Sequence, residues 1–338
     1  MMVDAPPTAI LARSRAPTCA QGAGGDGRIA TALADFLLDP AERLSEQERA
    51  QMTSMLAVLI GGIAEDLAVR LGIGVAMEFT GEEIVGRLRA AGLLHRPRLI
   101  ALLLRRAGLD RFREAVGEGG AALLQGFAAD NDPGVAAAAM AVVLARASSQ
   151  DRFGRPGLSL GDCDAETAVD LTYAVAAAFD VDGEETLVAA AVDLLARHDE
   201  GERLEALEAR LILALDQAGR MDAAVLLGLA ARGEIGMLAE ALARLARIPA
   251  DAAWSLLVQG DEDALGRLLR MAEQPRAVAA GLIAALVATL GLAAPAAAIA
   301  AFDDVTSAET AAERARQRLP SSFQAARAAL RGDGHYRA

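Results

Sequence analysis

From residue 45 onward, the sequence alternates between short stretches with apolar residues at helical spacing and polar or Gly/Pro-containing breaks. The first stretch, 45–71, carries apolar residues at intervals of three and four: Met52, Leu56, Leu59, Ile63 and Leu67. These fall on one face, so the stretch predicts a long amphipathic helix. Later stretches often begin with a capping box or with proline, whose missing N–H would have no partner in the first turn of a helix. We therefore expect one long helix followed by many short ones.

The later helices are expected at 80–91, 96–107, 110–129, 133–147, 164–179, 184–198, 202–218, 221–231, 234–247, 250–258, 261–272, 275–291, 295–302 and 307–330. No segment alternates apolar and polar residues as a half-buried strand does. Aromatic residues make up only 3% of the chain, which argues against a β-sandwich or barrel. Short helices joined by tight turns predict an all-α fold of stacked helical hairpins, a HEAT-like α-solenoid without a sheet.

The breaks also suggest a division of the chain. Residues 1–27 are rich in proline, glycine, alanine and serine and lack helical periodicity, which is typical of a flexible tail. The polar segment 148–161 contains glycine and proline and is the best candidate for a linker. We expect an N-terminal helical block over 28–147 and a C-terminal helical-repeat block over 162–338.

Charge is distributed unevenly along the chain. The formal net charge is −13 and the pI is about 4.8, which disfavours nucleic acid as a partner. Between residues 87 and 113, however, there are eight arginines and one acidic residue, a local net charge of +7. The arginines are Arg87, Arg89, Arg96, Arg98, Arg105, Arg106, Arg111 and Arg113. They predict a docking face for an acidic or phosphorylated protein, or else they pair internally with the acidic C-terminal block.

Reactive motifs lack the context that their chemistry requires. Ser159 is the central residue of a G-x-S-x-G match over 157–161, but the residues before it do not form a buried strand, as a nucleophile elbow needs. A hydrolase that uses Ser159 or an unrecognised carboxylate is kept as an alternative function. The two cysteines and three histidines are scattered, so we expect no catalytic residue, cofactor or metal site. The single tryptophan, Trp254, lies among leucines and alanines and is expected in the core.

The stretch 277–302 contains no charged residue and is long enough to cross a bilayer. Pro295 interrupts it, and alanine and glycine make up much of it. We expect a buried helix followed by a second helix, with membrane attachment through 277–302 as the alternative. Because residues 1–27 contain no apolar run of signal-peptide length, we expect a cytoplasmic protein.

Two stretches resemble known families. Asp132-Pro133-Gly134-Val135 and the alanines that follow are similar to the start of the second helix of a HEAT repeat, with Ala136 in place of the usual arginine. The segment Phe36–Arg49, followed by Met52 and Met55-Leu56, resembles the opening of the alphaproteobacterial family known as domain of unknown function 2336. This resemblance covers about 31–72 and implies a bacterial, cytoplasmic, helical-repeat protein without an assigned reaction. The sequence therefore favours a non-catalytic protein–protein interaction or regulatory scaffold module, with a homodimer through the long helix as a further expectation.

Overall fold

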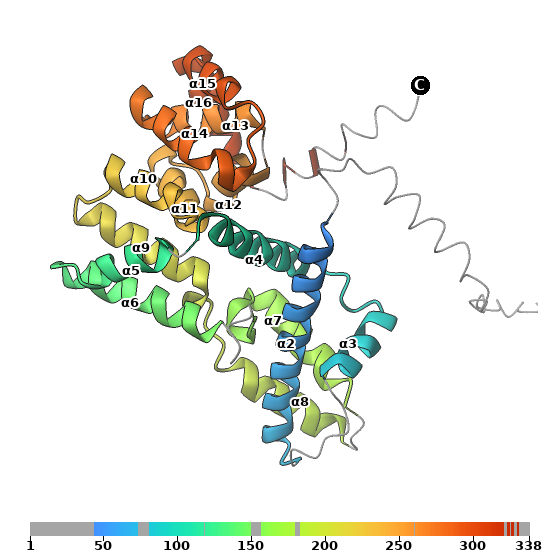
Figure 1. The fold of residues 1–338 in the computed structure, drawn as a ribbon. Coiled ribbons are helices and arrows are strands. Elements are labelled where there is room, and N and C mark those ends of the chain that lie inside the picture. The colour runs from blue at the N-terminus through green and yellow to red at the C-terminus, as the bar shows by residue number, and fades with distance from the viewer. Residues whose placement is uncertain are drawn as a thin grey trace, which may run out of the picture. The chain divides into compact units, whose positions relative to one another are not determined.

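The computed structural model describes residues 44–73, 81–117, 119–149, 157–179, 183–259 and 261–320, together with a few residues between 323 and 330. Within these ranges the regular structure is helical and contains no strand, which confirms the all-α prediction (Figure 1). The predicted tail, 1–27, and most of the predicted linker, 150–156, lie outside the described residues.

The longer helices are α2 (Glu46–Arg70), α3 (Gly81–Ala90), α4 (Pro97–Val116), α5 (Gly119–Ala128), α6 (Pro133–Ser148), α7 (Ala165–Ala176), α8 (Glu184–Leu195), α9 (Leu204–Gln217), α10 (Ala223–Ala231), α11 (Ile235–Ala246), α12 (Ala250–Trp254), α13 (Glu262–Met271), α14 (Arg276–Leu290), α15 (Pro295–Asp304) and α16 (Ser307–Gln317). The short helices η2 (Leu160–Asp162) and η3 (Glu200–Glu202) precede α7 and α9, and the π-helix η4 (Ser255–Gln259) continues from α12.

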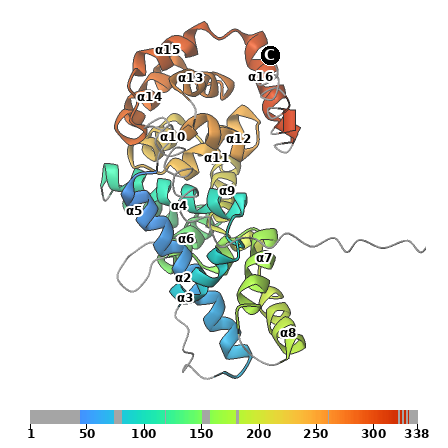
Figure 2. The same ribbon diagram turned by 90° about the vertical axis from the view of Figure 1, so that its right-hand side faces the viewer.

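The long helix predicted at 45–71 is confirmed as α2 (Figure 2). Its apolar stripe is buried, with Met55, Ile60 and Leu67 showing no solvent exposure. Helix α3 approaches the backbone of α2 closely at Gly81, where an added Cβ would lie 3.1 Å from the carbonyl oxygen of Ala57. Glycine therefore allows α2 and α3 to pack against each other at this point.

Two helices cover the region predicted as 96–107 and 110–129, but the predicted break between them is wrong, because it follows Val116 and not residue 107. A single helix, α4, runs through Gly108 to Val116 and ends at Gly117, whose φ of 74° is favourable only for glycine. A glycine inside a helix costs only about 1 kcal/mol relative to alanine. Burial of Leu109 and Phe112, each 1% exposed, outweighs that cost and keeps the chain helical. At the other end of the chain, α16 ends at Gln317 and not at residue 330.

Buried apolar side chains form two clusters. The α2 cluster combines residues of α2, α3 and the first half of α4 with residues of 158–194, and the α11 cluster combines residues of 109–142 with residues of 204–302. Helix α4 belongs to both, because Leu99 and Leu103 enter the α2 cluster and Leu109 and Phe112 enter the α11 cluster. Each cluster takes residues from both sides of 148–161, so that segment does not separate two hydrophobic cores.

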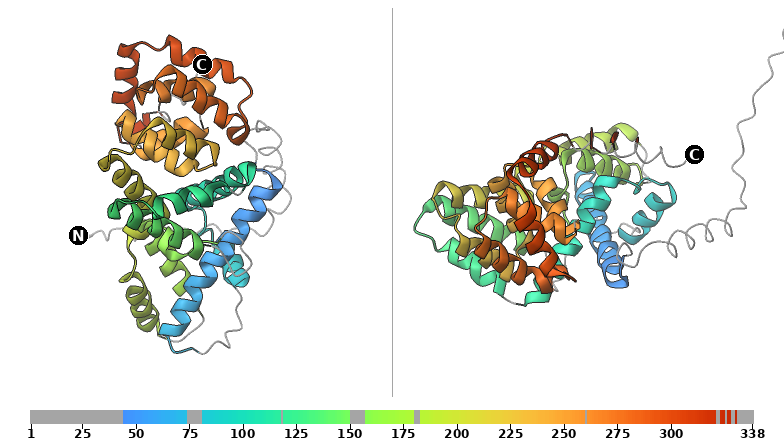
Figure 3. Two further views of the ribbon diagram at one scale, coloured as in Figure 1. Left: turned by 60° about the vertical axis from the view of Figure 1, so that its left-hand side comes forward. Right: turned by 90° about the horizontal axis from the view of Figure 1, so that it is seen from above.

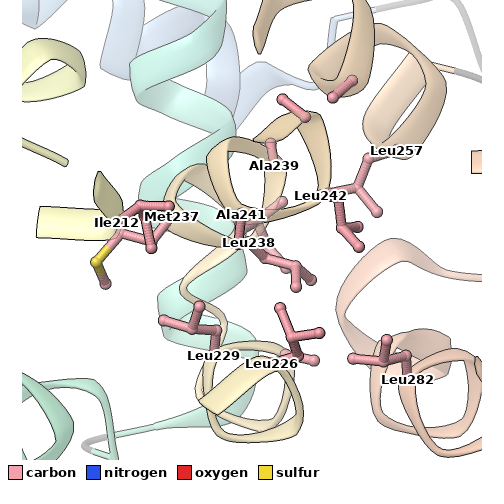
Figure 4. Close-up of a cluster of buried hydrophobic side chains, with 14 of the residues drawn as sticks. Ile212, Leu226, Leu229, Met237, Leu238, Ala239, Ala241, Leu242, Leu257 and Leu282 are labelled. Carbon is pink, nitrogen blue, oxygen red and sulfur yellow. The ribbon is translucent and has the colours of Figure 1, made fainter. Parts of the chain in front are cut away.

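Helix α11 lies at the centre of the α11 cluster and packs against α9, α10, α12 and α13 (Figure 3). Leu238 and Leu242 point toward Leu226, Leu257 and Leu282 from three other elements (Figure 4). Trp254 also belongs to this cluster and is 7% exposed, as the sequence predicted.

The apolar stretch 277–302 forms two helices, α14 and α15, as expected. Leu282, Leu286 and Phe302 are buried in the α11 cluster, and α15 packs against α13 so closely that a Cβ on Gly266 would lie 2.4 Å from the carbonyl oxygen of Ala298. The stretch is therefore part of the protein core. Among the described residues, only α2 is long and apolar enough to cross a membrane, and 44% of that apolar window is buried inside the molecule.

Candidate functional site: an arginine-lined cavity

The arginines of the basic segment lie on α3, on α4 and just before α4, and most of them pair with other parts of the chain. On the surface, Arg96 pairs with Asp170 at 2.9 Å, Arg98 with Glu166 at 2.7 Å and Arg111 with Glu48 at 2.7 Å. Arg87 donates to the backbone carbonyl of Ala178. Arg89 is exposed on α3. Arg96 and Arg98 therefore pair with acids of 162–338, as one of the two interpretations expected. Arg111 instead pairs within the N-terminal block, and Arg87 bonds to a backbone carbonyl.

The second half of α4 directs arginines into the molecule. Arg106 is 6% exposed, and its Nη2 donates to Asp162 at 2.9 Å and to Glu205 at 3.2 Å. Arg105 forms an ion pair with Asp251 at 3.3 Å, and its guanidinium carbon lies 4.6 Å from the centre of the Trp254 ring. The basic segment therefore contributes its charge to an internal network as well as to the surface.

The centre of that network is Arg146 on α6, which the sequence reasoning missed. Its two terminal nitrogens donate to both carboxylate oxygens of Glu234, at 2.8 and 2.7 Å, and Nη2 also donates to Glu208 at 2.8 Å. Both glutamates have side chains only 1% exposed. A guanidinium fork suits this bidentate arrangement. Glu208 is accommodated by Gly236, where an added Cβ would lie 2.5 Å from its Oε2.

Two residues of this network, Arg146 and Glu208, could have been identified from the sequence. Arg146 continues the buried stripe of α6, after Val135, Ala139 and Val142, and Glu208 falls within the buried stripe of α9, between Leu207 and Leu211. Charged residues on the apolar face of an amphipathic helix require a buried partner. The sequence could have flagged both positions, but it could not have paired them.

The pKa values of the network follow from burial and mutual charge. Burial alone would raise the pKa of Glu208, but Arg146 and Arg113 hold that pKa below its usual value. Burial alone would lower the pKa of Arg146, but the negative charges of Glu208 and Glu234 raise it. For Arg113 the balance is reversed, because burial and the positive charge of Arg146 lower its pKa despite the neighbouring glutamates. Of Arg113 and Arg146, Arg113 is thus the one whose charge is less compensated by nearby carboxylates.

Beside the network lies a cavity of about 540 Å³. Its apolar lining includes Met55 from the α2 cluster and Leu124 and Leu204 from the α11 cluster, so the cavity lies where the two clusters meet. The charged lining residues are Arg106, Asp110, Arg113, Arg146, Arg232 and Glu234.

Several of these arginines retain hydrogen-bond donors without a partner, including the buried Nε of Arg106 and of Arg146. Nε and Nη2 of Arg113 have no hydrogen-bond partner, since Glu234 and Glu208 lie at 3.7 and 3.9 Å, and Nη1 reaches Asp110 only at 3.4 Å. Arg232 makes one long hydrogen bond, from Nη1 to the carbonyl of Gly228 at 3.4 Å, and forms no ion pair within the described part of the chain. In contrast, the terminal nitrogens of Arg146 are fully engaged.

The structure places the other sequence candidates away from reactive partners. The hydroxyl of Ser159 donates to Asp162 at 2.9 Å in the turn that begins η2, and the ring of His198 contacts the carbonyl of Cys163 at 3.0 Å. Burial, followed by the charges of Asp162 and Asp164, raises the pKa of the Cys163 thiol to about 12. No cluster of metal-ligating side chains occurs among the described residues. The arrangement around the cavity is suited to binding an anion.

On the surface, exposed apolar side chains occur in pairs four residues apart on several helices: Ile100 and Leu104, Met140 and Leu144, Val169 and Tyr173, and Val188 and Val192. Isolated exposed apolar residues are ordinary in soluble proteins, but pairs at this spacing form a second stripe on a helix that already buries another. The last two pairs lie on α7 and α8, which pack against each other.

Comparisons with known proteins assign no relative. No family model matches the chain, and no curated protein or solved structure matches it either. The resemblance to the domain of unknown function 2336 family therefore stays a prediction from sequence.

Proposed function

We propose that this protein is a non-catalytic, cytoplasmic protein–protein interaction module with a regulatory or scaffolding role. The observation that carries the proposal is that α7 and α8 each expose a pair of apolar side chains, which we take to form one surface, the α7–α8 surface. Val169 and Tyr173 are 41% and 38% exposed, and Val188 and Val192 are 49% and 51% exposed, on two helices that contact each other. Apolar side chains at the centre of an interface supply much of its binding free energy, because they lose contact with water on association.

The finer architecture belongs to the same proposal. We infer that the packed helix pairs, such as α7 with α8 and α5 with α6, continue as a HEAT-like stack of hairpins. Such arrays bind partners along extended surfaces and need no reactive pocket. The sequence resemblance to a helical-repeat family supports this architecture.

The basic segment has a secondary role in the proposed interface. Arg96 and Arg98 remain 46% and 62% exposed while paired with acids of 164–170, so an acidic or phosphorylated partner would compete with existing ion pairs. Exposed ion pairs contribute at most about 1 kcal/mol, which makes exchange of partners feasible. The arginines would then set the orientation of an interface whose affinity comes from apolar contacts.

The test uses two sets of variants in a pull-down with identification of the bound proteins. Val188→Ser combined with Val192→Ser should abolish capture of the specific partner, whereas the control Leu213→Ser, at a side chain 37% exposed on α9, should not. Arg96→Glu combined with Arg98→Glu should weaken capture and reduce its salt dependence. Light scattering on the same samples distinguishes a second copy of this chain from a different protein. Unchanged capture by the valine variant, with helicity confirmed by circular dichroism, would refute the proposed interface.

A further inference from the structure

We propose that the arginine-lined cavity binds a small organic anion, a molecule with one phosphate or carboxylate group and an apolar body, and that Arg113 and Arg232 hold the anionic group. This site is independent of the α7–α8 surface, and each proposal can fail without the other.

The first step concerns unused donors. Nη1 of Arg113 has only one weak acceptor, Asp110 at 3.4 Å, and Arg232 makes a single long hydrogen bond to its own helix. Both line the same cavity. A guanidinium presents its N–H groups as a fork that matches the oxygens of phosphate and carboxylate. An anion between the two arginines would accept hydrogen bonds from Nη1 of Arg113 and from Arg232, whose hydrogen bonds within the described structure are long.

The second step concerns charge. The cavity lining carries four arginines and two acids. Two of the arginines, Arg106 and Arg146, also pair with carboxylates outside the lining, which leaves Arg113 and Arg232 as the less compensated cations. Of the acids, Glu234 is engaged by both terminal nitrogens of Arg146, and Asp110 accepts from Gln51 at 3.1 Å. The wall near Arg113 and Arg232 therefore favours a negative ligand.

A helix end adds to this preference. Ala121, in the first turn of α5, lines the cavity together with Gln125 of the same helix. The first N–H groups of an α-helix have no acceptor within the helix, and the N-terminal end carries partial positive charge. The N-terminal turn of α5 thus borders the same cavity as the two arginines.

The third step concerns size and polarity. A volume of about 540 Å³ falls within the usual range of small-molecule sites. Met55, Leu124, Val143 and Leu204 form an apolar part of the lining, which a bare inorganic ion would leave uncovered. The combination of apolar walls with a few charged groups favours an organic anion over a simple salt ion.

The experiment is calorimetric titration of the full-length protein with phenyl phosphate, and with inorganic phosphate and phenol as matched probes for each half of the ligand. We expect saturable binding of phenyl phosphate, at least tenfold tighter than that of inorganic phosphate, and no binding of phenol. Arg232→Gln should weaken phenyl phosphate binding at least tenfold, because it removes charge-assisted hydrogen bonds. The control Arg276→Gln removes an exposed arginine that pairs with Asp303 away from the cavity, and it should leave binding unchanged.

Arg113→Gln is the second variant, but Arg113 also contacts the buried glutamates, so loss of folding is one result for it. Arg232 has no ion pair among the described residues, which keeps the test decisive. Absence of saturable heat with phenyl phosphate, or equal affinity of the Arg232→Gln and Arg276→Gln variants, would overturn the site. Binding of inorganic phosphate as tight as that of phenyl phosphate would overturn the assignment to an organic anion.

Discussion

Replacement of Arg146 by methionine tests whether the buried network stabilises the fold. The substitution retains a long flexible side chain but removes the guanidinium that makes three hydrogen bonds of 2.7–2.8 Å to Glu208 and Glu234. Removal of one partner of a buried ion pair costs about 3–5 kcal/mol, because the other charge stays buried without compensation. Here two carboxylates, each 1% exposed, lose their hydrogen-bond partner at once and retain only Arg113 at 3.7–3.9 Å, so we expect a loss of about 3–5 kcal/mol in the free energy of unfolding.

The assay is urea unfolding followed by circular dichroism, with Arg244→Met as the matched control. Arg244 pairs with Asp216 at 2.6 Å, but the two side chains are 43% and 38% exposed, so its loss should cost less than about 1 kcal/mol. Addition of Glu208→Gln to Arg146→Met should recover part of the lost stability, although Glu208→Gln alone destabilises the protein. Glu208→Gln thus destabilises the native protein but stabilises the Arg146→Met variant, and such a change in sign indicates that the two residues are energetically coupled.

The pH dependence gives an independent check. In the native protein the pKa of Glu208 is lowered, so its contribution to stability is present above the unfolded pKa and is lost as the pH falls. Without Arg146, burial dominates and raises that pKa, so the variant should become less stable as the pH rises from 4.5 to 8. A loss below about 1 kcal/mol, or a loss that does not vary with pH, would refute the reasoning.

Three further predictions concern single residues. Burial, only partly offset by Arg105, raises the pKa of Glu240 from 4.5 to about 7, so the native protein loses stability as the pH rises through this range. The Glu240→Gln variant lacks this loss. Its free energy of unfolding, measured in urea, should therefore rise by about 3 kcal/mol relative to that of the native protein between pH 4.5 and pH 8. Gly233→Ala should destabilise the protein by more than 2 kcal/mol, because φ is 66° and the new Cβ would lie 2.4 Å from the carbonyl oxygen of Phe112. The control Gly72→Ala has the same φ but no atom within 4 Å of the new Cβ, so it should cost about 1 kcal/mol. Cys163 should react with iodoacetamide only on unfolding, since the thiol is buried and its pKa is about 12. Rapid labelling of Cys163 in the native protein, resolved from labelling of Cys19 by peptide mass spectrometry, would contradict this.

The cavity gives a route by which a ligand could influence an interaction surface. The residues that line the cavity include Met55 of the α2 cluster and Leu204 of the α11 cluster. The α2 cluster also contains the buried side chains of α7 and α8. A ligand in the cavity would therefore contact both clusters. If the anion changes the affinity for the partner protein, the partner protein must change the affinity for the anion by the same factor.

The sequence by itself determined that this chain folds into helices and where most of them begin and end. Periodic apolar residues, caps and N-terminal prolines act within a few residues of one another, so α2, α6 and α14 could be located from local pattern alone. The same local rules failed at Gly108, where burial of Leu109 and Phe112 against distant helices kept α4 continuous. Only the tertiary structure determined which partners the eight arginines have. It also placed Arg146 beside Glu208 and Glu234, which lie 62 and 88 positions further along the chain. The physical reason is range: helix formation depends on neighbours in sequence, whereas pairing of buried charges depends on which helices pack together.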